Sequence, residues 1–109
     1  MRFVVWPSEV DARLSRKYGR AVKKSVAVDS PNLGEVEDAV LSLGFKIIEK
    51  APEKLNPRLS GLDEELRTRG MLIVESPYGK GKTLKLIAEK IRELRARTRA
   101  KGKSKRKRR

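Results

Sequence analysis

The chain has 109 residues, with 28 Lys and Arg against 14 Asp and Glu and a formal net charge of +14. It contains neither Cys nor His, which excludes disulfides and thiolate metal sites and removes the commonest general base and metal ligand. No apolar run approaches the roughly 18 residues of a membrane span, and the start lacks the apolar region of a secretory signal, so we expect a soluble, cytoplasmic protein without membrane insertion.

Much of the excess charge lies at the C-terminal end. Ten of the last fifteen residues are Lys or Arg and none is acidic, whereas residues 1–94 hold 18 basic and 14 acidic side chains. A segment of Gly, Ser, Lys and Arg has no apolar side chains to bury. We therefore predict one domain over residues 1–97 and a disordered basic tail over residues 98–109.

The first predicted element is a strand over residues 2–6, a β-branched and aromatic run that Pro7 stops. Residues 8–24 follow as a basic, irregular connection. A helical turn around residues 10–14 fits the pattern, but Gly19 breaks any longer helix.

Ser30 and Pro31 predict the start of a helix, with Ser30 as the N-cap and Pro31 at the first helical position. The apolar residues that follow recur three and four positions apart, as on one face of a helix. Gly44 is expected to end this helix, and residues 45–50 are predicted to form the second strand.

The nearly continuous apolar run at residues 70–75 predicts a third strand. Between the second and third strands lies a polar loop over residues 51–69, and loops longer than about 12–15 residues are usually functional or disordered. A final helix is predicted over residues 82–97, where apolar residues again recur three and four apart. Lys85 and Glu89, one turn apart on it, are typical of a surface ion pair.

The predicted order is therefore strand, helix, strand, strand, helix. Two helices can cover one face of a three-stranded sheet, and the long loop allows antiparallel pairing of the second and third strands. We predict an α+β two-layer sandwich with a three-stranded antiparallel sheet.

A cluster of basic residues in the first connection gives the strongest functional signal. Six Lys and Arg lie between residues 13 and 24, none follows until Lys46, and four acidic residues occupy that gap. A solvated basic loop would show the same charge run. Tyr18 and Gly19 favour nucleic acid, because a Tyr can stack on an unpaired base and a Gly lets the backbone approach a phosphate.

Residues 79–83 contain Gly-Lys-Thr at a helix start, as a nucleotide-binding P-loop does. The full signature needs a Gly five residues before Gly81, where this chain has Ser76, and a P-loop enzyme also needs a larger parallel sheet and a metal-holding acid. We therefore expect no enzyme and no cofactor. Two interpretations remain, a plain basic helix start and a site where Lys80 and Lys82 hold an RNA phosphate.

A series of short motifs also runs through residues 2–97. In chain order these are Trp6-Pro7, Val10-Asp11, Ser15-Arg16, Gly19-Arg20 with Lys24, Ser30-Pro31, Pro57-Arg58, Arg69-Gly70 and Gly81-Lys82. The series resembles the archaeal form of the nineteen-kilodalton RNA-binding protein of the signal recognition particle. That family commonly has Gly-Arg-Arg where this chain has Gly19, Arg20 and Ala21, and aromatic residues after Pro-Arg where this chain has Leu59 and Ser60.

The resemblance implies the same fold, binding to the particle RNA, and clamping of the tips of its helices six and eight. It also implies that the protein prepares the RNA for the signal-sequence-binding GTPase subunit in co-translational targeting, and we expect a monomer. We expect the loops over residues 8–24 and 51–69 to become ordered on binding. The predicted RNA-binding residues are Arg16, Lys17, Tyr18, Gly19, Arg20, Lys23, Lys24, Arg58, Arg67, Arg69, Lys80 and Lys82.

Three other functions stay open at this point. The first is a ribosomal or general structured-RNA-binding protein of similar architecture. The second is a small nucleotide-binding enzyme built on Gly81, Lys82 and Thr83, and the third is a DNA-compacting protein that uses its cationic tail.

Overall fold

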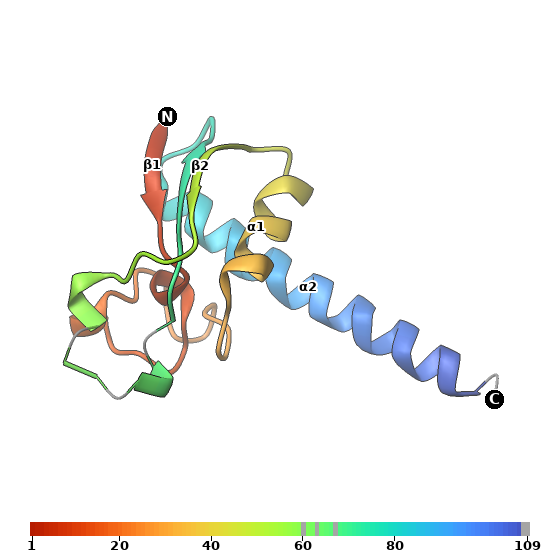
Figure 1. Ribbon diagram of the computed structural model, residues 1–109. Coiled ribbons are helices and arrows are strands. Elements are labelled where there is room, and N and C mark those ends of the chain that lie inside the picture. Colours follow the sequence, from red (N-terminus) through yellow and green to blue (C-terminus); the bar gives the residue numbers. More distant parts are fainter. Residues whose placement is uncertain (60, 63, 67, 108–109) are drawn as a thin grey trace.

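The computed structural model describes the backbone of residues 1–59, 61–62, 64–66 and 68–107. Of the predicted RNA-binding residues, Arg67 lies outside the described residues, and the side chain of Arg58 does so as well. The elements follow in the order β1 (Arg2–Val5), α1 (Leu33–Ser42), β2 (Lys46–Ala51), β3 (Met71–Glu75) and α2 (Lys80–Lys107) (Figure 1). The type and order of the elements are as the sequence predicts.

The three strands form one antiparallel sheet in the order β1-β3-β2. Val74 of the central strand lies opposite Phe3 on one side and Ile47 on the other, and the register shifts between Ile47 and Glu49. Because side chains alternate between the two faces of a strand, these three apolar residues point to the same face. The prediction of an antiparallel three-stranded sheet is confirmed.

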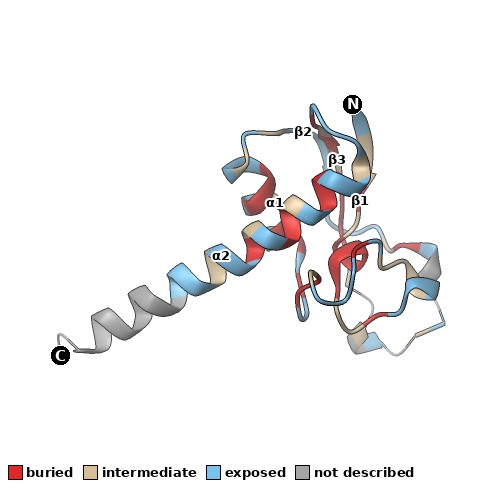
Figure 2. Cartoon of the chain, turned by 180° about the vertical axis from the view of Figure 1, so that it is seen from behind, coloured by how far each residue is buried: buried red, intermediate tan, exposed pale blue. Residues whose placement is uncertain are grey.

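Both helices pack on that face of the sheet and contact each other. The core joins the inward residues of the sheet, such as Leu72, to buried residues of α1 such as Val36 and of α2 such as Ile87. Figure 2 shows the buried positions gathered where the two helices meet the strands. The two-layer α+β sandwich is therefore confirmed.

Helix α1 begins later than the sequence predicts, and Ser30 as its N-cap is wrong. Asn32 is the N-cap: its side chain accepts a hydrogen bond from the backbone N–H of Glu35 at 2.9 Å, and the Glu35 carboxylate accepts one from the backbone N–H of Asn32 at 3.3 Å. This reciprocal pair satisfies two backbone N–H groups at the start of the helix. Ser30 lies before this start, with a φ of +48°. Gly44, with a φ of +81°, ends the helix as predicted.

Helix α2 is longer than predicted. The sequence places its end near residue 97, with a disordered tail beyond, whereas the helical backbone continues to Lys107. Among the side chains that the structure describes, the buried ones of α2 lie in its first half, up to Ile91, and Figure 1 shows the second half of the helical backbone projecting from the domain. Apolar periodicity reports only the packed half, while Ala, Lys and Arg favour a helical backbone without packing. The domain limits of 1–97 and 98–109 stay a prediction.

Candidate nucleic-acid interface

The connection between β1 and α1, residues 6–32, is called the first loop here, and its middle packs against the core. Val10, Leu14 and Val22 are buried. The backbone N–H of Ala12 donates to the carbonyl of Val28 at 2.8 Å, and the N–H of Val28 donates to the carbonyl of Val10 at 2.9 Å. The two ends of the basic stretch are thereby tied together, and its charged residues lie on the segment between them.

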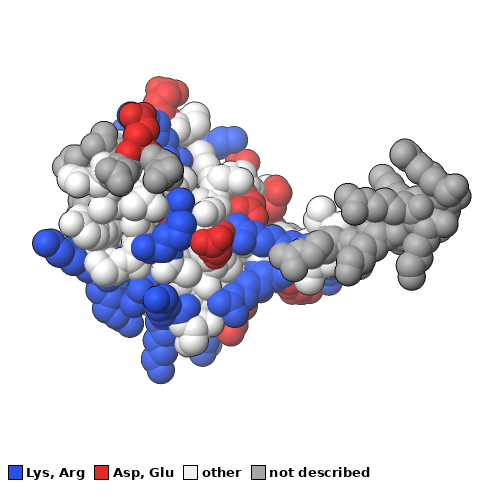
Figure 3. All heavy atoms as spheres, turned by 90° about the horizontal axis from the view of Figure 1, so that it is seen from below, with Lys and Arg blue, Asp and Glu red and all other residues white. Residues whose placement is uncertain are grey.

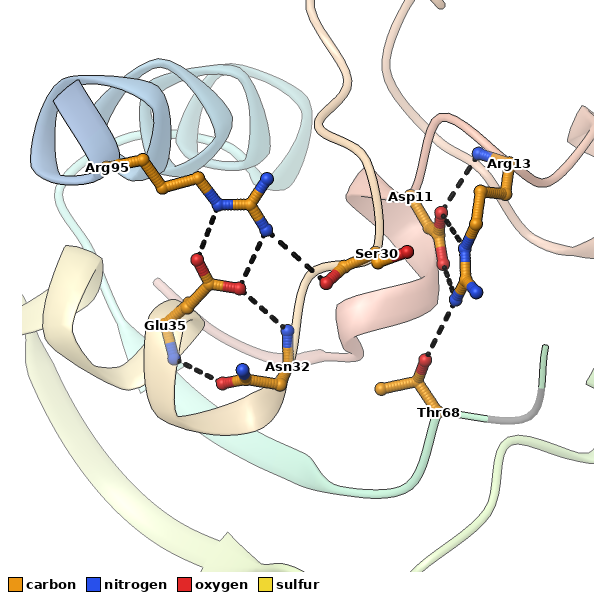
Figure 4. Close-up of polar contacts among 7 residues, drawn as sticks. All are labelled: Asp11, Arg13, Ser30, Asn32, Glu35, Thr68 and Arg95. Carbon is orange, nitrogen blue, oxygen red and sulfur yellow. Dashed lines mark hydrogen bonds and ion pairs between the residues drawn. The ribbon is translucent and has the colours of Figure 1, made fainter. Parts of the chain in front are cut away.

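A buried carboxylate organises this loop (Figure 4). The Asp11 side chain is fully buried and accepts hydrogen bonds from the backbone N–H of Arg13 at 2.9 Å and from its guanidinium at 2.9 and 3.2 Å. The same guanidinium donates to the Thr68 hydroxyl at 3.5 Å, in the connection between β2 and β3. That connection, residues 52–70, is the second loop. Arg13 therefore joins the two loops and is engaged within the fold.

Arg20, predicted to contact RNA, also has a structural role. Its Nη1 donates to the carbonyl of Leu14 at 2.8 Å and its Nε donates to the carbonyl of Val22 at 3.1 Å. The preceding Gly19 has a φ of +104°, in the left-handed region that glycine adopts most readily. Residues 19 and 20 thus shape the turn that carries the neighbouring cations, a role that the charge pattern alone did not indicate.

The two lysines at the start of α2 have different surroundings. The Nζ of Lys80 lies 2.9 Å from a carboxylate oxygen of Glu9, whose other oxygen accepts from the backbone N–H of Trp6 at 2.9 Å. Lys82 lies with its Nζ 4.3 Å from the centre of the Tyr78 ring, which makes an edge contact with Phe45. Lys80 therefore anchors α2 to the first loop, and Lys82 belongs to an aromatic cluster beside the start of β2.

Four cations of the first loop remain exposed, and within the described part of the chain none of them has a carboxylate partner. We call them the loop face, and they are Arg16, Lys17, Lys23 and Lys24. Figure 3 views the molecule from the end where the loops lie, and Lys and Arg side chains gather along the lower left of this view. Such a concentration of uncompensated positive charge is suited to phosphates.

The second loop lies beside the loop face. Its short helical turn at Pro57–Leu59 contacts the turn at Arg16–Tyr18, and Leu59 is fully buried. Tyr18 is half-buried, with the Nζ of Lys17 lying 5.6 Å from its ring centre. Arg69 is exposed and donates one hydrogen bond to the Glu53 carbonyl at 3.2 Å. Segments about 40 residues apart in the sequence thus meet at one surface.

On the helices, an acidic residue of α1 pairs with a basic residue of α2. All the charged residues of α1 are acidic, and Glu35 accepts two hydrogen bonds from Arg95 of α2 at 2.6 and 2.8 Å (Figure 4). Arg95 also donates to the Ser30 carbonyl at 3.3 Å. The hydrogen bond from Arg95 lowers the pKa of the Glu35 carboxyl below its usual value, and the same contact raises the pKa of Arg95. Here cations and carboxylates neutralise each other, unlike on the loop face.

The Gly-Lys-Thr motif does not have the surroundings of a P-loop. Thr83 is fully buried, and its hydroxyl lies 2.9 Å from the hydroxyl of Ser76 and donates to the carbonyl of Gly79 at 2.9 Å. The preceding strand β3 has antiparallel neighbours on both sides. A P-loop Thr needs a hydroxyl free for a metal ion, next to a parallel sheet. The nucleotide-binding interpretation has no support in this geometry.

The sequence profile described as "SRP19 protein" matches residues 4–94. The chain belongs to the SRP19 protein family. It is 67% identical over 106 residues to the signal recognition particle 19 kDa protein of Thermococcus kodakarensis, covering 96% of this chain and 98% of that one. It is 65% identical over 97 residues to the protein of the same name from Pyrococcus furiosus, covering 89% of this chain and 97% of that one.

Solved SRP19 structures have the same fold. A Pyrococcus furiosus structure, described as one of the two proteins assembling the ribonucleic core of the particle, matches with a TM-score of 0.79 at 58% identity, over 92% of this chain and 96% of that chain. A second SRP19, in complex with the S domain of signal recognition particle RNA, matches with a TM-score of 0.70 at 30% identity, over 82% of this chain and 95% of that chain. Between residues 1 and 107, leaving out those not described, neither helix of this SRP19 family member has the apolar length of a membrane crossing.

Sequence reasoning missed the residues that hold the loops in place. Asp11, Glu9 and Asn56 are polar and buried, and they connect the first loop to its own backbone, to α2 and to the second loop. The Asn56 amide lies 3.5 Å from the Ser8 hydroxyl. The position of Asp11, two residues before Arg13, indicated a local ion pair. Nothing in the sequence pattern indicated that the Asp11 carboxylate would be buried.

Proposed function

We propose that this chain is the RNA-binding subunit of a signal recognition particle, a non-enzymatic cytoplasmic protein that acts as a monomer. The observation that carries the proposal is the loop face, where four exposed cations without described carboxylate partners stand on a loop fixed by the buried Asp11. The S-domain RNA bound by the SRP19 relative is the ligand that we assign to this surface. No cofactor enters the proposal.

The finer part of the proposal concerns the arrangement of the RNA. We infer that the protein clamps the tips of RNA helices six and eight and prepares the RNA for the signal-sequence-binding GTPase subunit. Placing two RNA helices side by side concentrates phosphate charge, which cations from two adjoining loops offset. Tips also present unpaired bases, which are accessible to side chains, unlike the deep groove of an RNA duplex. The contact between the turns at residues 16–18 and 57–59 supports a single surface with both loops in it.

The internal bonds of the first loop also support tight binding. From the sequence we expected residues 8–24 to become ordered on binding. We now propose instead that this loop is arranged beforehand, because Arg20 and Arg13 hold its backbone and side-chain groups. A surface arranged beforehand lowers the entropic cost of association. When a phosphate binds, only the side chains of Arg16, Lys23 and Lys24 then have to become ordered.

Competition between ligands tests the proposal. Labelled S-domain RNA bound to the full chain is challenged at matched salt with a structured ribosomal RNA fragment and with duplex DNA. We expect S-domain RNA to compete at least tenfold better than either, because tips and loops are read by shape and unpaired bases. Equal competition by ribosomal RNA would indicate a general RNA-binding protein, and equal competition by DNA would indicate a compacting protein, and either result contradicts the proposal.

A truncated chain of residues 1–97 separates the tail from the domain. The tail supplies eight of the cations, so its removal should weaken binding to all three ligands and reduce the salt dependence. The preference for S-domain RNA should persist. A preference lost with the tail would place recognition outside the loop face.

A further inference from the structure

A hollow lies between the first loop and the start of α2, beside the loop face. Its volume is about 470 Å³, within the roughly 300–1,000 Å³ range of ligand sites. Its lining includes the apolar Ala21, Val22 and Val26 of the first loop and Gly81 of α2. It therefore combines an apolar surface with room for a group larger than a phosphate.

The rim of this hollow is cationic. Arg16, Lys23 and Lys85 line it, and none of the residues that line it is acidic. Lys85, which the sequence indicated as the partner of Glu89, forms no ion pair among the described residues and faces this hollow instead. A lining that combines apolar residues with cations matches a nucleotide, because the apolar residues suit the base and the cations suit its phosphate groups.

Gly81 provides an independent indication. It lies in the first turn of α2, where a glycine is less favourable than alanine, and a Cβ built there would meet no atom within 4 Å. Its φ lies outside the positive range of the chain's left-handed glycines, Gly19, Gly44 and Gly70. Neither packing nor backbone conformation within the protein requires glycine, so the open Cα favours close approach by a group from outside.

Ala21 keeps the hollow open. It is exposed on the first loop and lines the hollow. Its short side chain leaves apolar space, and Lys85 supplies a cation to the same hollow from α2. The site can therefore accept an apolar group beside its cations.

We propose that this hollow binds one unstacked nucleotide of the RNA. Its base lies on Ala21, Val22 and Val26, and its phosphates lie beside Lys85 and Lys23, near the open Cα of Gly81. The inference rests on the proposed function and adds to it a site for a single base. Bases splayed out of RNA loops are commonly held in this way, by apolar or aromatic contact on the face and cations on the backbone.

The experiment tests whether the hollow binds the base at one particular position of the RNA. S-domain RNAs with a single abasic residue at each unpaired position in turn are titrated with the wild-type full chain and with Ala21→Leu, which fills the hollow without changing charge. We expect one abasic position to weaken wild-type binding about tenfold, and the same position to have less than a twofold effect on Ala21→Leu. Ser25→Leu, which fills the hollow from another wall, serves if Ala21→Leu shows a lowered melting temperature.

Two controls make the outcomes distinct. Ala96→Leu adds the same side chain at an exposed position of α2 away from this hollow and should keep the wild-type abasic profile. Lys85→Gln should weaken binding several-fold, whereas Lys46→Gln, at an exposed lysine of β2, should not. If the wild type binds intact RNA tightly but all variants have the same abasic profile as the wild type, the nucleotide site is overturned and the proposed function still holds. Failure of the wild type to prefer S-domain RNA would overturn both.

Discussion

The helical side and the loop side of this molecule use charge in opposite ways. On the helices, Glu35 and Arg95 are each other's partners, and Lys50 of β2 pairs with Glu37 of α1 at 3.2 Å. On the loops, the carboxylates of Asp11 and Glu9 are buried and hold the chain in place, while the cations of the loop face are exposed and have no described carboxylate partners. The two pairs on the helical side neutralise their cations, whereas the four cations of the loop face have no carboxylate partner among the described residues.

This difference explains how the body of the protein would bind RNA selectively under the proposed function, even though its net charge is small. A cation neutralised by a neighbouring carboxylate offers little to a phosphate, because the neighbour repels the ligand and holds the side chain. Glu9 and Asp11 of the first loop are buried and act on structure, so they take few cations away from the ligand. The comparison predicts that fold and RNA binding respond differently to changes on each side.

The largest effect is expected from Asp11→Ala. This change removes the buried acceptor of three hydrogen bonds from Arg13 and leaves that guanidinium with its bond to Thr68. Breaking such an arrangement costs about 3 kcal/mol of unfolding free energy, and the loop face should lose its shape and bind RNA at least tenfold more weakly. Urea unfolding and RNA titration measure the two effects. Stability within about 0.5 kcal/mol of the wild type would show that Asp11 does not organise the loop.

A smaller effect on the helical side is expected from Glu35→Gln, with stability lowered by about 1 kcal/mol at pH 7 and RNA affinity unchanged within twofold. The pKa of Glu35 is lowered by its hydrogen bond with Arg95, so the folded protein binds this proton less readily than the unfolded chain does. The stabilisation is therefore present above the usual carboxyl pKa and is lost as the pH falls through the lower folded value.

Urea unfolding at pH 7 and pH 3 follows this loss. The wild type should lose more stability than Glu35→Gln over this interval, and Glu37→Gln, whose partner Lys50 is more exposed than Arg95, serves as the matched control. A wild type and a Glu35→Gln variant with parallel pH profiles would be inconsistent with the ion pair as described.

The smallest effect on stability is expected from Gly81→Ala, and it should have the opposite sign. Alanine is favoured over glycine in a helix, and the added Cβ meets no neighbour, so the free energy of unfolding should rise by about 0.5–1 kcal/mol. RNA binding should weaken several-fold at the same time, because the methyl group stands where the ligand approaches. Gly79→Ala, equally open in the free protein, is the comparison. A variant that is more stable and binds RNA as well as the wild type would remove Gly81 from the interface.

The sequence predicted the elements better than the roles of the charged residues. The apolar spacing around Val36 and Ile87 reports burial directly, so both helices and their common face followed from it. The cap at Asn32 was missed because the Ser30-Pro31 signal competes with it, and only the carboxylate of Glu35 decides between them. The end of α2 was missed because the apolar spacing in the sequence stops near residue 97, whereas the helical backbone continues to Lys107.

The candidate site was predictable as a region and not residue by residue. Arg20 and Lys24 have the same signal in the sequence, yet Arg20 donates to two carbonyls of its own loop and Lys24 is exposed. Lys80 and Lys85 are similarly alike in the sequence, and only the fold pairs Lys80 with Glu9 and places Lys85 at the hollow. Which cation contacts a buried acceptor depends on the tertiary fold, and a run of charged residues in the sequence does not contain that information.

The salt dependence of RNA binding tests the central claim most directly. Lys23→Ala with Lys24→Ala changes two exposed cations of the loop face, and Lys46→Ala with Lys50→Ala changes two lysines of β2. We expect the Lys23 and Lys24 double variant to weaken S-domain RNA binding about tenfold or more and to reduce the slope of log affinity against log salt by about 1–2. Its unfolding free energy should be unchanged. The Lys46 and Lys50 double variant should keep the wild-type slope. Equal slopes for the wild type and both double variants would contradict the assignment of RNA binding to the loop face.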